Sequence, residues 1–145
     1  MKTNGGFLVT KIKQLGDRIF ERILAEKNID AFNGAQGRIL YVLWQEDGVP
    51  IKIISEKSGL AITSLTTMLE RMEKNGLISR KTDEADKRKT LLFLTDKAKE
   101  LKEAYDSVSN EMGKIYYRDF TDKEILQFEE YLNRIRVNLE EWSDK

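Results

Sequence analysis

The chain contains no cysteine and no histidine among its 145 residues, and only one proline. Without cysteine it can form neither disulfides nor thiolate metal sites, and it cannot sense oxidants through a thiol. Without histidine it lacks the usual general base of enzymes and the commonest ligand of transition metals. We therefore expect neither a catalytic site nor a metal or other cofactor, although carboxylates alone can hold a hard cation.

Long apolar runs are also absent, since no stretch of about 18 consecutive apolar residues occurs. We expect no membrane partner, and because the N-terminal residues show no secretion signal, we expect a cytoplasmic protein. Charge, by contrast, is abundant: 34% of the residues are Asp, Glu, Lys or Arg, against 40% that are hydrophobic. This composition favours a mainly helical protein with charged outer faces.

The net charge is zero, but the charges are unevenly distributed along the chain. Residues 51–94 hold nine Lys or Arg and six Asp or Glu, a net charge of +3, which leaves −3 on the remainder. A basic segment on an acidic body is typical of nucleic-acid readers. The excess is modest, so it supports that interpretation only together with the motif inside the segment.

Apolar residues recur at three- and four-residue steps in most of the chain, which predicts amphipathic helices. The predicted helices cover residues 7–28, 35–45, 52–58 and 62–75, followed by two helices between residues 96 and 143. A capping box at Thr121–Glu124 marks the start of the last helix, and Gly59 is placed to cap the third. The sustained repeat in the last two helices indicates packing along a shared seam, either within one chain or in a dimer.

The segment from Leu60 to Thr95 predicts a winged helix-turn-helix. A short helix is followed by a turn at Asn75–Gly76 and by two strands, at residues 77–82 and 89–94, joined by a charged loop. A helix that fits a DNA groove, next to a basic hairpin, predicts a reader of double-stranded DNA.

The helix at 62–75 carries short hydroxyl side chains opposite its apolar residues and on the flanks between the two sides. Serine and threonine are poor helix formers, but their short side chains allow close approach to a groove, and their hydroxyls can form hydrogen bonds to bases or phosphates. The alternative is that they cap the helix and face water. The candidate DNA-binding residues of this helix are Thr63, Ser64, Thr66 and Thr67, with Arg71 and Lys74 further along as phosphate contacts.

The loop of the hairpin concentrates cations at its tip. Lys87, Arg88 and Lys89 are candidate DNA contacts, because arginine entering a narrow minor groove reads the shape of DNA. Asp86 lies two residues before Arg88, close enough to hold the guanidinium in a bidentate pair. A solvated charge cluster is the alternative, and the preceding helix favours DNA contact.

The chain resembles the MarR family of bacterial and archaeal regulators over nearly its whole length. The resemblance is carried by AQGRILYVLW at residues 35–44, by MLERMEKNGLISRKTDEADKRKTLLFLTDKAKEL at residues 68–101 and by the flanking helices. It implies a single domain of mainly α class (an α+β winged helix) over residues 1–145. The winged-helix DNA-binding lobe would cover about 49–95, and dimerisation helices about 7–28 and 96–143.

The resemblance also implies how the parts work. The helix at 62–75 would enter the major groove, and Arg88, supported by Asp86, would enter the minor groove. A homodimer would repress by occupying a palindromic operator, and a small aromatic or anionic effector would release it. Thr67 stands where many members have a basic residue, and Lys87 where arginine is common, so the operator sequence is not predictable. Members that sense peroxide through cysteine or zinc through histidine are excluded by composition.

An effector is expected in the crevice between the dimer helices and the DNA-binding lobe. The candidate residues are an aromatic and cationic set on helices expected to meet there: Arg38, Tyr41, Trp44 and Tyr105. Core packing is the alternative role for each of them. For the whole chain, the alternative function is a winged helix that binds another protein and no operator.

Overall fold

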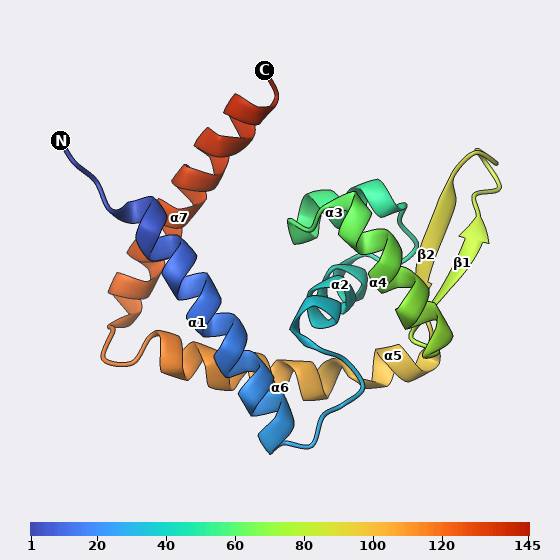
Figure 1. The fold of residues 1–145 in the computed structure, drawn as a ribbon, viewed down its shortest axis with the longest axis horizontal. Helices are drawn as coiled ribbons and strands as arrows, with labels where there is room; N and C mark the ends of the chain where they lie inside the picture. The colour runs from blue at the N-terminus through green and yellow to red at the C-terminus, as the bar shows by residue number, and fades with distance from the viewer. The chain divides into compact units, whose positions relative to one another are not determined.

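The computed structural model describes residues 1–145, which form two compact units, residues 1–110 and 111–145. The protein is mainly helical, with one small antiparallel sheet of two strands, β1 (Ile78–Thr82) and β2 (Thr90–Leu94) (Figure 1). None of the helices combines the length and the apolar composition that a membrane crossing needs. The helices are α1 (Gly5–Glu26), α2 (Gly34–Gln45), α3 (Ile51–Ser58), α4 (Ile62–Lys74), α5 (Asp96–Glu100), α6 (Lys102–Tyr116) and α7 (Asp122–Ser143).

The predicted helices and strands are confirmed, with one correction. The first of the two helices predicted between residues 96 and 143 is divided at Leu101 into the one-turn helix α5 and the longer helix α6. At this joint the Leu101 N–H donates to the carbonyl of Ala98, three residues back, at 3.2 Å. The apolar spacing continues through the joint, so periodicity alone could not locate it.

The core of the first unit lies between α2, α3, α4 and the sheet. Helix α2 is apolar on most of its circumference and supplies more buried side chains than any other helix. Each large side chain buried in this way stabilises the fold by about 1.5–3 kcal/mol. The largest fully buried side chains of these elements and of the turn between α4 and β1 are Ile39, Leu40, Leu43, Ile54, Leu65, Leu69, Met72, Leu77 and Leu92.

Local signals set the helix ends in this unit. Gly59 and Gly76 both adopt φ near +75°, the left-handed conformation that ends α3 and follows α4, as their places in the sequence predicted. Helix α2 starts at a capping box that was not predicted: the side chain of Asn33 accepts from the Gln36 N–H, and the side chain of Gln36 accepts from the Asn33 N–H.

The hairpin is anchored to the helices at one end only. Its register pairs Ile78 with Leu94 at the root and Thr82 with Thr90 near the tip. Val49, just before α3, pairs with Leu92 on the outer edge of β2. Beyond this pairing the hairpin extends away from the helices of its unit (Figure 1).

The second unit is built on α7 and the turn that precedes it. The predicted capping box is present: the Thr121 hydroxyl accepts from the Glu124 N–H at 3.2 Å, and the Glu124 carboxylate accepts from the Thr121 N–H at 2.9 Å. The Tyr117 hydroxyl donates to Glu129 at 2.6 Å, and burial together with this bond raises the pKa of Tyr117 to about 12. No residue of α7 is buried.

Candidate nucleic-acid interface

Helix α4 has one face in the core and one face in solvent. Leu65, Leu69 and Met72 have no accessible surface, whereas the hydroxyl-bearing residues at 63, 64, 66 and 67 are exposed. The helix has no side-chain cap, because Ala61 occupies the N-cap position. Burial of the apolar face therefore holds α4 in place and leaves its polar face available for a ligand.

The four hydroxyls are not equivalent. Thr66 donates to the carbonyl of Ile62, one turn back, at 3.0 Å, so its hydroxyl is left mainly as an acceptor. The hydroxyls of Thr63, Ser64 and Thr67 make no hydrogen bond within the chain. These three are the ones free to donate to acceptors on a bound molecule.

Cations lie at the C-terminal end of the same helix. Arg71 and Lys74 are exposed in the last turn of α4, where the partial negative charge of the helix end favours a positive side chain. Just beyond it, Arg80 of β1 lies 3.5 Å from the carboxylate of Glu73. Arg71 and Lys74 thus keep their charge directed to solvent, as expected of residues that contact phosphates.

At the tip of the hairpin, Arg88 is held in an ordered arrangement although it is exposed. Its Nε and Nη2 donate to the two carboxylate oxygens of Asp86 at 3.0 and 3.1 Å, and its backbone N–H donates to Oδ1 at 3.1 Å. The Arg88 side chain remains 90% exposed. These bonds lower the pKa of Asp86 and raise that of Arg88, so both groups are charged at neutral pH.

The rest of the loop keeps this tip compact. The Lys89 N–H donates to the Asp86 carbonyl at 3.0 Å, and the Asp83 N–H donates to the Lys89 carbonyl at 2.9 Å. The side chains of Lys87 and Lys89 are exposed on either side of Arg88. Three consecutive cations therefore project from a loop whose backbone is closed by its own hydrogen bonds.

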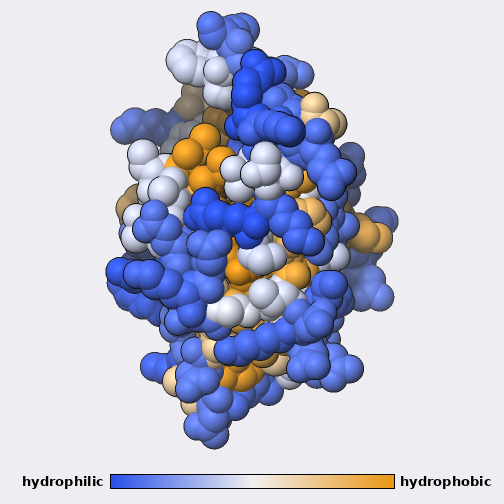
Figure 2. Space-filling view, turned by 90° about the vertical axis from the view of Figure 1, so that its right-hand side faces the viewer, coloured by the Kyte–Doolittle hydropathy of each residue, from blue (hydrophilic) through white to orange (hydrophobic).

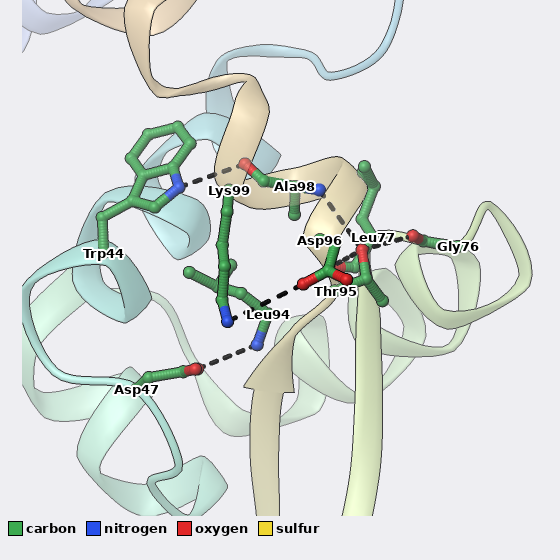
Figure 3. Close-up of polar contacts among 9 residues, drawn as sticks. All are labelled: Trp44, Asp47, Gly76, Leu77, Leu94, Thr95, Asp96, Ala98 and Lys99. Atoms are coloured by element: carbon green, nitrogen blue, oxygen red, sulfur yellow. Dashed lines mark hydrogen bonds and ion pairs between the residues drawn. The ribbon is translucent and has the colours of Figure 1, made fainter.

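Side-chain hydrogen bonds fix the root of the hairpin, and the residues that make them were not predicted from the sequence (Figure 3). The Thr95 hydroxyl donates to the carbonyls of Gly76 and Leu77, at 2.6 and 3.2 Å, which joins the end of β2 to the turn after α4. Asp47, in the turn after α2, accepts from the Leu94 N–H at 2.8 Å. Both contacts join residues far apart in the chain, so no local sequence pattern predicts them.

The surface around the hairpin is mainly polar. Figure 2 shows this side of the molecule, where hydrophilic residues dominate and hydrophobic ones appear only in small areas between them. Such a surface suits a hydrated, charged partner such as DNA better than an apolar one.

The aromatic residues predicted to bind an effector gather around Tyr105. The rings of Trp44 and Tyr41 lie 5.3 and 5.8 Å from it, centroid to centroid. Phe20 and Phe32, each at 6.1 Å, also belong to the cluster, although neither was predicted to do so. Burial is the main cause that raises the pKa of Tyr105, and neighbouring Tyr41 adds to it, while the charge of Arg38 opposes the shift.

Comparison with a family model and with curated proteins shows similarity in only part of the chain. The model of the MarR family matches residues 32–90. Over 75 residues the chain is 37% identical to the HTH-type transcriptional regulator TtmR of Methylorubrum extorquens, which covers 52% of this chain and 38% of that protein. Over 64 residues it is 42% identical to the organic hydroperoxide resistance transcriptional regulator of Bacillus subtilis, covering 44% of each. The matches thus span less than half the length of either relative.

Solved structures are similar over nearly the whole chain. The transcriptional regulator SlyA superposes with a TM-score of 0.84 at 22% identity, covering 97% of this chain and 98% of that one. Bordetella bronchiseptica BpsR, studied for regulation of its DNA binding by 6-hydroxynicotinic acid, gives 0.82 at 18% identity over 92% and 99%. A mutant of MarR from E. coli complexed with operator DNA gives 0.80 at 22% identity over 90% and 91%. At these identities the likeness establishes the winged-helix fold alone.

Proposed function

We propose that this chain, whose residues 32–90 match the model of the MarR family and whose relatives are named as transcriptional regulators and not as enzymes, binds a specific double-stranded DNA operator. Helix α4 enters the major groove through Thr63, Ser64 and Thr67. Thr66 accepts hydrogen bonds, and Arg71 and Lys74 bind phosphates. The tip of the hairpin, with Lys87, Arg88 and Lys89, enters the adjacent minor groove.

The observation that best supports this proposal is the state of Arg88. An arginine without a binding role gains little by being held in one orientation while 90% exposed, since exposed ion pairs contribute little to stability. The bidentate pair with Asp86 instead removes freedom that the side chain would otherwise lose on binding. Asp86 thereby acts as the support of the tip, and Arg88 as its probe of the minor groove.

We propose further that the operator is palindromic and that the protein binds it as a homodimer. Helix α1 exposes Phe7, Leu8, Ile12 and Leu15, and α7 exposes apolar residues along most of its length. Exposed apolar surface of this extent marks an interaction site, and a second copy of the chain would cover it. Two copies would present two α4 helices to successive major grooves, about 34–36 Å apart.

We also propose that an aromatic or anionic effector regulates DNA binding by this dimer, which acts as a cytoplasmic repressor. The cluster around Tyr105, with Arg38 nearby, offers aromatic surfaces and a positive charge to such a ligand. Oxidation of a thiol cannot be the signal, because the chain has no cysteine, although one relative is named for organic hydroperoxide resistance.

The test begins by selecting bound duplexes from a random pool with the purified protein. We expect a palindromic sequence with half-sites about 10 base pairs apart, centre to centre. Arg88→Ala should weaken binding to this sequence about tenfold to a hundredfold and reduce the salt dependence by about one phosphate contact. Affinity is measured by fluorescence anisotropy across a range of salt concentrations.

Lys145→Ala is the matched control, because it removes one exposed cation outside the hairpin and changes the net charge equally. It should bind like the wild type. If Arg88→Ala also binds like the wild type, the hairpin does not contact DNA. If no duplex is recovered even at low salt, the proposal fails as a whole, and a winged helix that binds protein replaces it.

A further inference from the structure

We propose that Asp47, which lies outside the DNA-contacting surface, is a positioning residue that sets the hairpin at a fixed angle to α4. The inference rests on the proposed function, in which α4 and the tip of the hairpin bind neighbouring grooves together. Both elements can do so only if the angle between them is constant, since a displacement of about 1 Å at a recognition site is enough to weaken its contacts.

Asp47 extends a backbone ladder on the outer edge of β2. The Leu92 N–H donates to the Val49 carbonyl at 2.9 Å, and two residues further along the Leu94 N–H donates to the carboxylate of Asp47 at 2.8 Å. Alternate N–H groups of a strand point to the same side, so both bonds lie on the edge that faces away from β1. Asp47 therefore replaces the strand carbonyl that would otherwise pair with Leu94 (Figure 3).

No other group of the chain bonds to the Leu94 N–H in this position. Leu94 is only 7% exposed, so water reaches its backbone poorly once the Asp47 carboxylate is gone. The neighbouring Gly48 has φ +71°, and a Cβ there would lie 2.5 Å from the ring of Phe93. The turn after α2 thus fits closely against β2 at three consecutive residues, which makes it the fixed point of the hairpin.

The charge of Asp47 provides a way to separate positioning from electrostatics. A carboxylate in a DNA-binding lobe repels phosphates, so its removal alone should strengthen binding. If Asp47→Ala weakens binding, the cause is the lost hydrogen bond and not the lost charge. The root of the hairpin and Arg88 are about 20 Å apart, taking roughly 3.3 Å per residue from Leu94, so the two side chains do not touch.

The experiment is a double-mutant cycle on operator affinity with Asp47→Ala and Arg88→Ala in the full-length protein. We expect Asp47→Ala to weaken binding by about threefold to tenfold. In that background the effect of Arg88→Ala should be smaller by a similar factor, because a misplaced tip makes weaker contacts with the groove. Asp47→Asn, which keeps an oxygen acceptor, should bind as tightly as the wild type or slightly tighter.

Asp96→Ala is the matched control at the root of the hairpin: its side chain is fully exposed, and its one ion pair, to Lys99, is 4.0 Å long. It removes the same charge and should not weaken binding. Hydrogen exchange gives a second measurement: in Asp47→Ala the Leu94 amide should exchange faster while the amides of α4 keep their protection.

Two results of the affinity measurements would overturn the inference. One is wild-type affinity in Asp47→Ala, and the other is an undiminished effect of Arg88→Ala in that background. Faster exchange throughout α4 would also overturn it, since Asp47 would then be a general stability residue. In each of these cases Arg88→Ala alone still weakens binding; if it does not, the hairpin does not contact DNA, and it is that part of the proposed function that has failed.

Discussion

Helices α4 and α7 are both amphipathic, yet the structure uses their apolar faces differently. In α4, Leu65, Leu69 and Met72 are completely buried and the exposed face is polar. In α7, which is 22 residues long, no side chain is buried, and Leu139 and Trp142 are 66% and 75% exposed. One helix buries its apolar face within the chain, whereas the other leaves most of its apolar residues exposed.

The difference indicates what each helix still requires. The apolar face of α4 is already buried within the chain, so the face that α4 exposes to solvent is one that forms hydrogen bonds. For α7 the apolar surface remains exposed to water, so burying it in a second copy of the chain would be favourable. The same spacing of apolar residues therefore produces a surface for recognition in α4 and a surface for assembly in α7.

The largest expected effect is on stability and comes from the buried face of α4. Leu69→Ala leaves a cavity at a fully buried position and should lower the free energy of unfolding by about 2–5 kcal/mol. Urea denaturation followed by circular dichroism measures it. Thr67→Ala, on the exposed face of the same helix, should change stability by no more than about 0.5 kcal/mol. Equal losses in the two variants would contradict the division of α4 into two faces.

A smaller effect is expected in α7, and it concerns assembly. Leu139→Glu should weaken the proposed dimer at least about tenfold, because a charge would have to be buried at the interface. Sedimentation equilibrium gives the dissociation constant. Asn138→Glu adds the same charge on a neighbouring exposed residue and serves as the control. A dimer of unchanged strength in Leu139→Glu would remove this face of α7 from the interface.

The smallest expected effect is at the start of α7. Thr121→Ala removes the acceptor of the Glu124 N–H and should destabilise the first turn by about 1 kcal/mol, whereas Thr121→Ser keeps the hydroxyl. Hydrogen exchange at the Glu124 amide measures the change. Unaltered protection in Thr121→Ala would show that packing, and not the cap, sets this end.

The same cap should respond to acid. Bonds to the backbone and side chain of Thr121 hold the pKa of Glu124 below its usual 4.5. A lowered pKa in the folded state stabilises the fold at pH above 4.5, and this contribution is lost as the pH falls through the lowered value. Protection of the first turn of α7 should therefore persist somewhat below pH 4.5 and then decline.

Several features of the candidate site were predictable because their partners are close in sequence. The Asp86–Arg88 pair spans two residues, the Thr121–Glu124 box spans three, and Gly59 follows directly the helix that it ends. Each forms through bonds that a few neighbouring residues make with one another. Helix type and approximate bounds followed from periodicity for the same reason.

The sequence by itself thus determined the helices, the hairpin and the paired arginine at its tip, since these depend on local bonding and on the spacing of apolar residues. Only the tertiary structure decided that Phe20 and Phe32 join the ring of Tyr105 and that Asp47 bonds to Leu94, 47 residues away. Contacts of this kind exist only once the intervening chain has folded, because its packing alone brings their partners together.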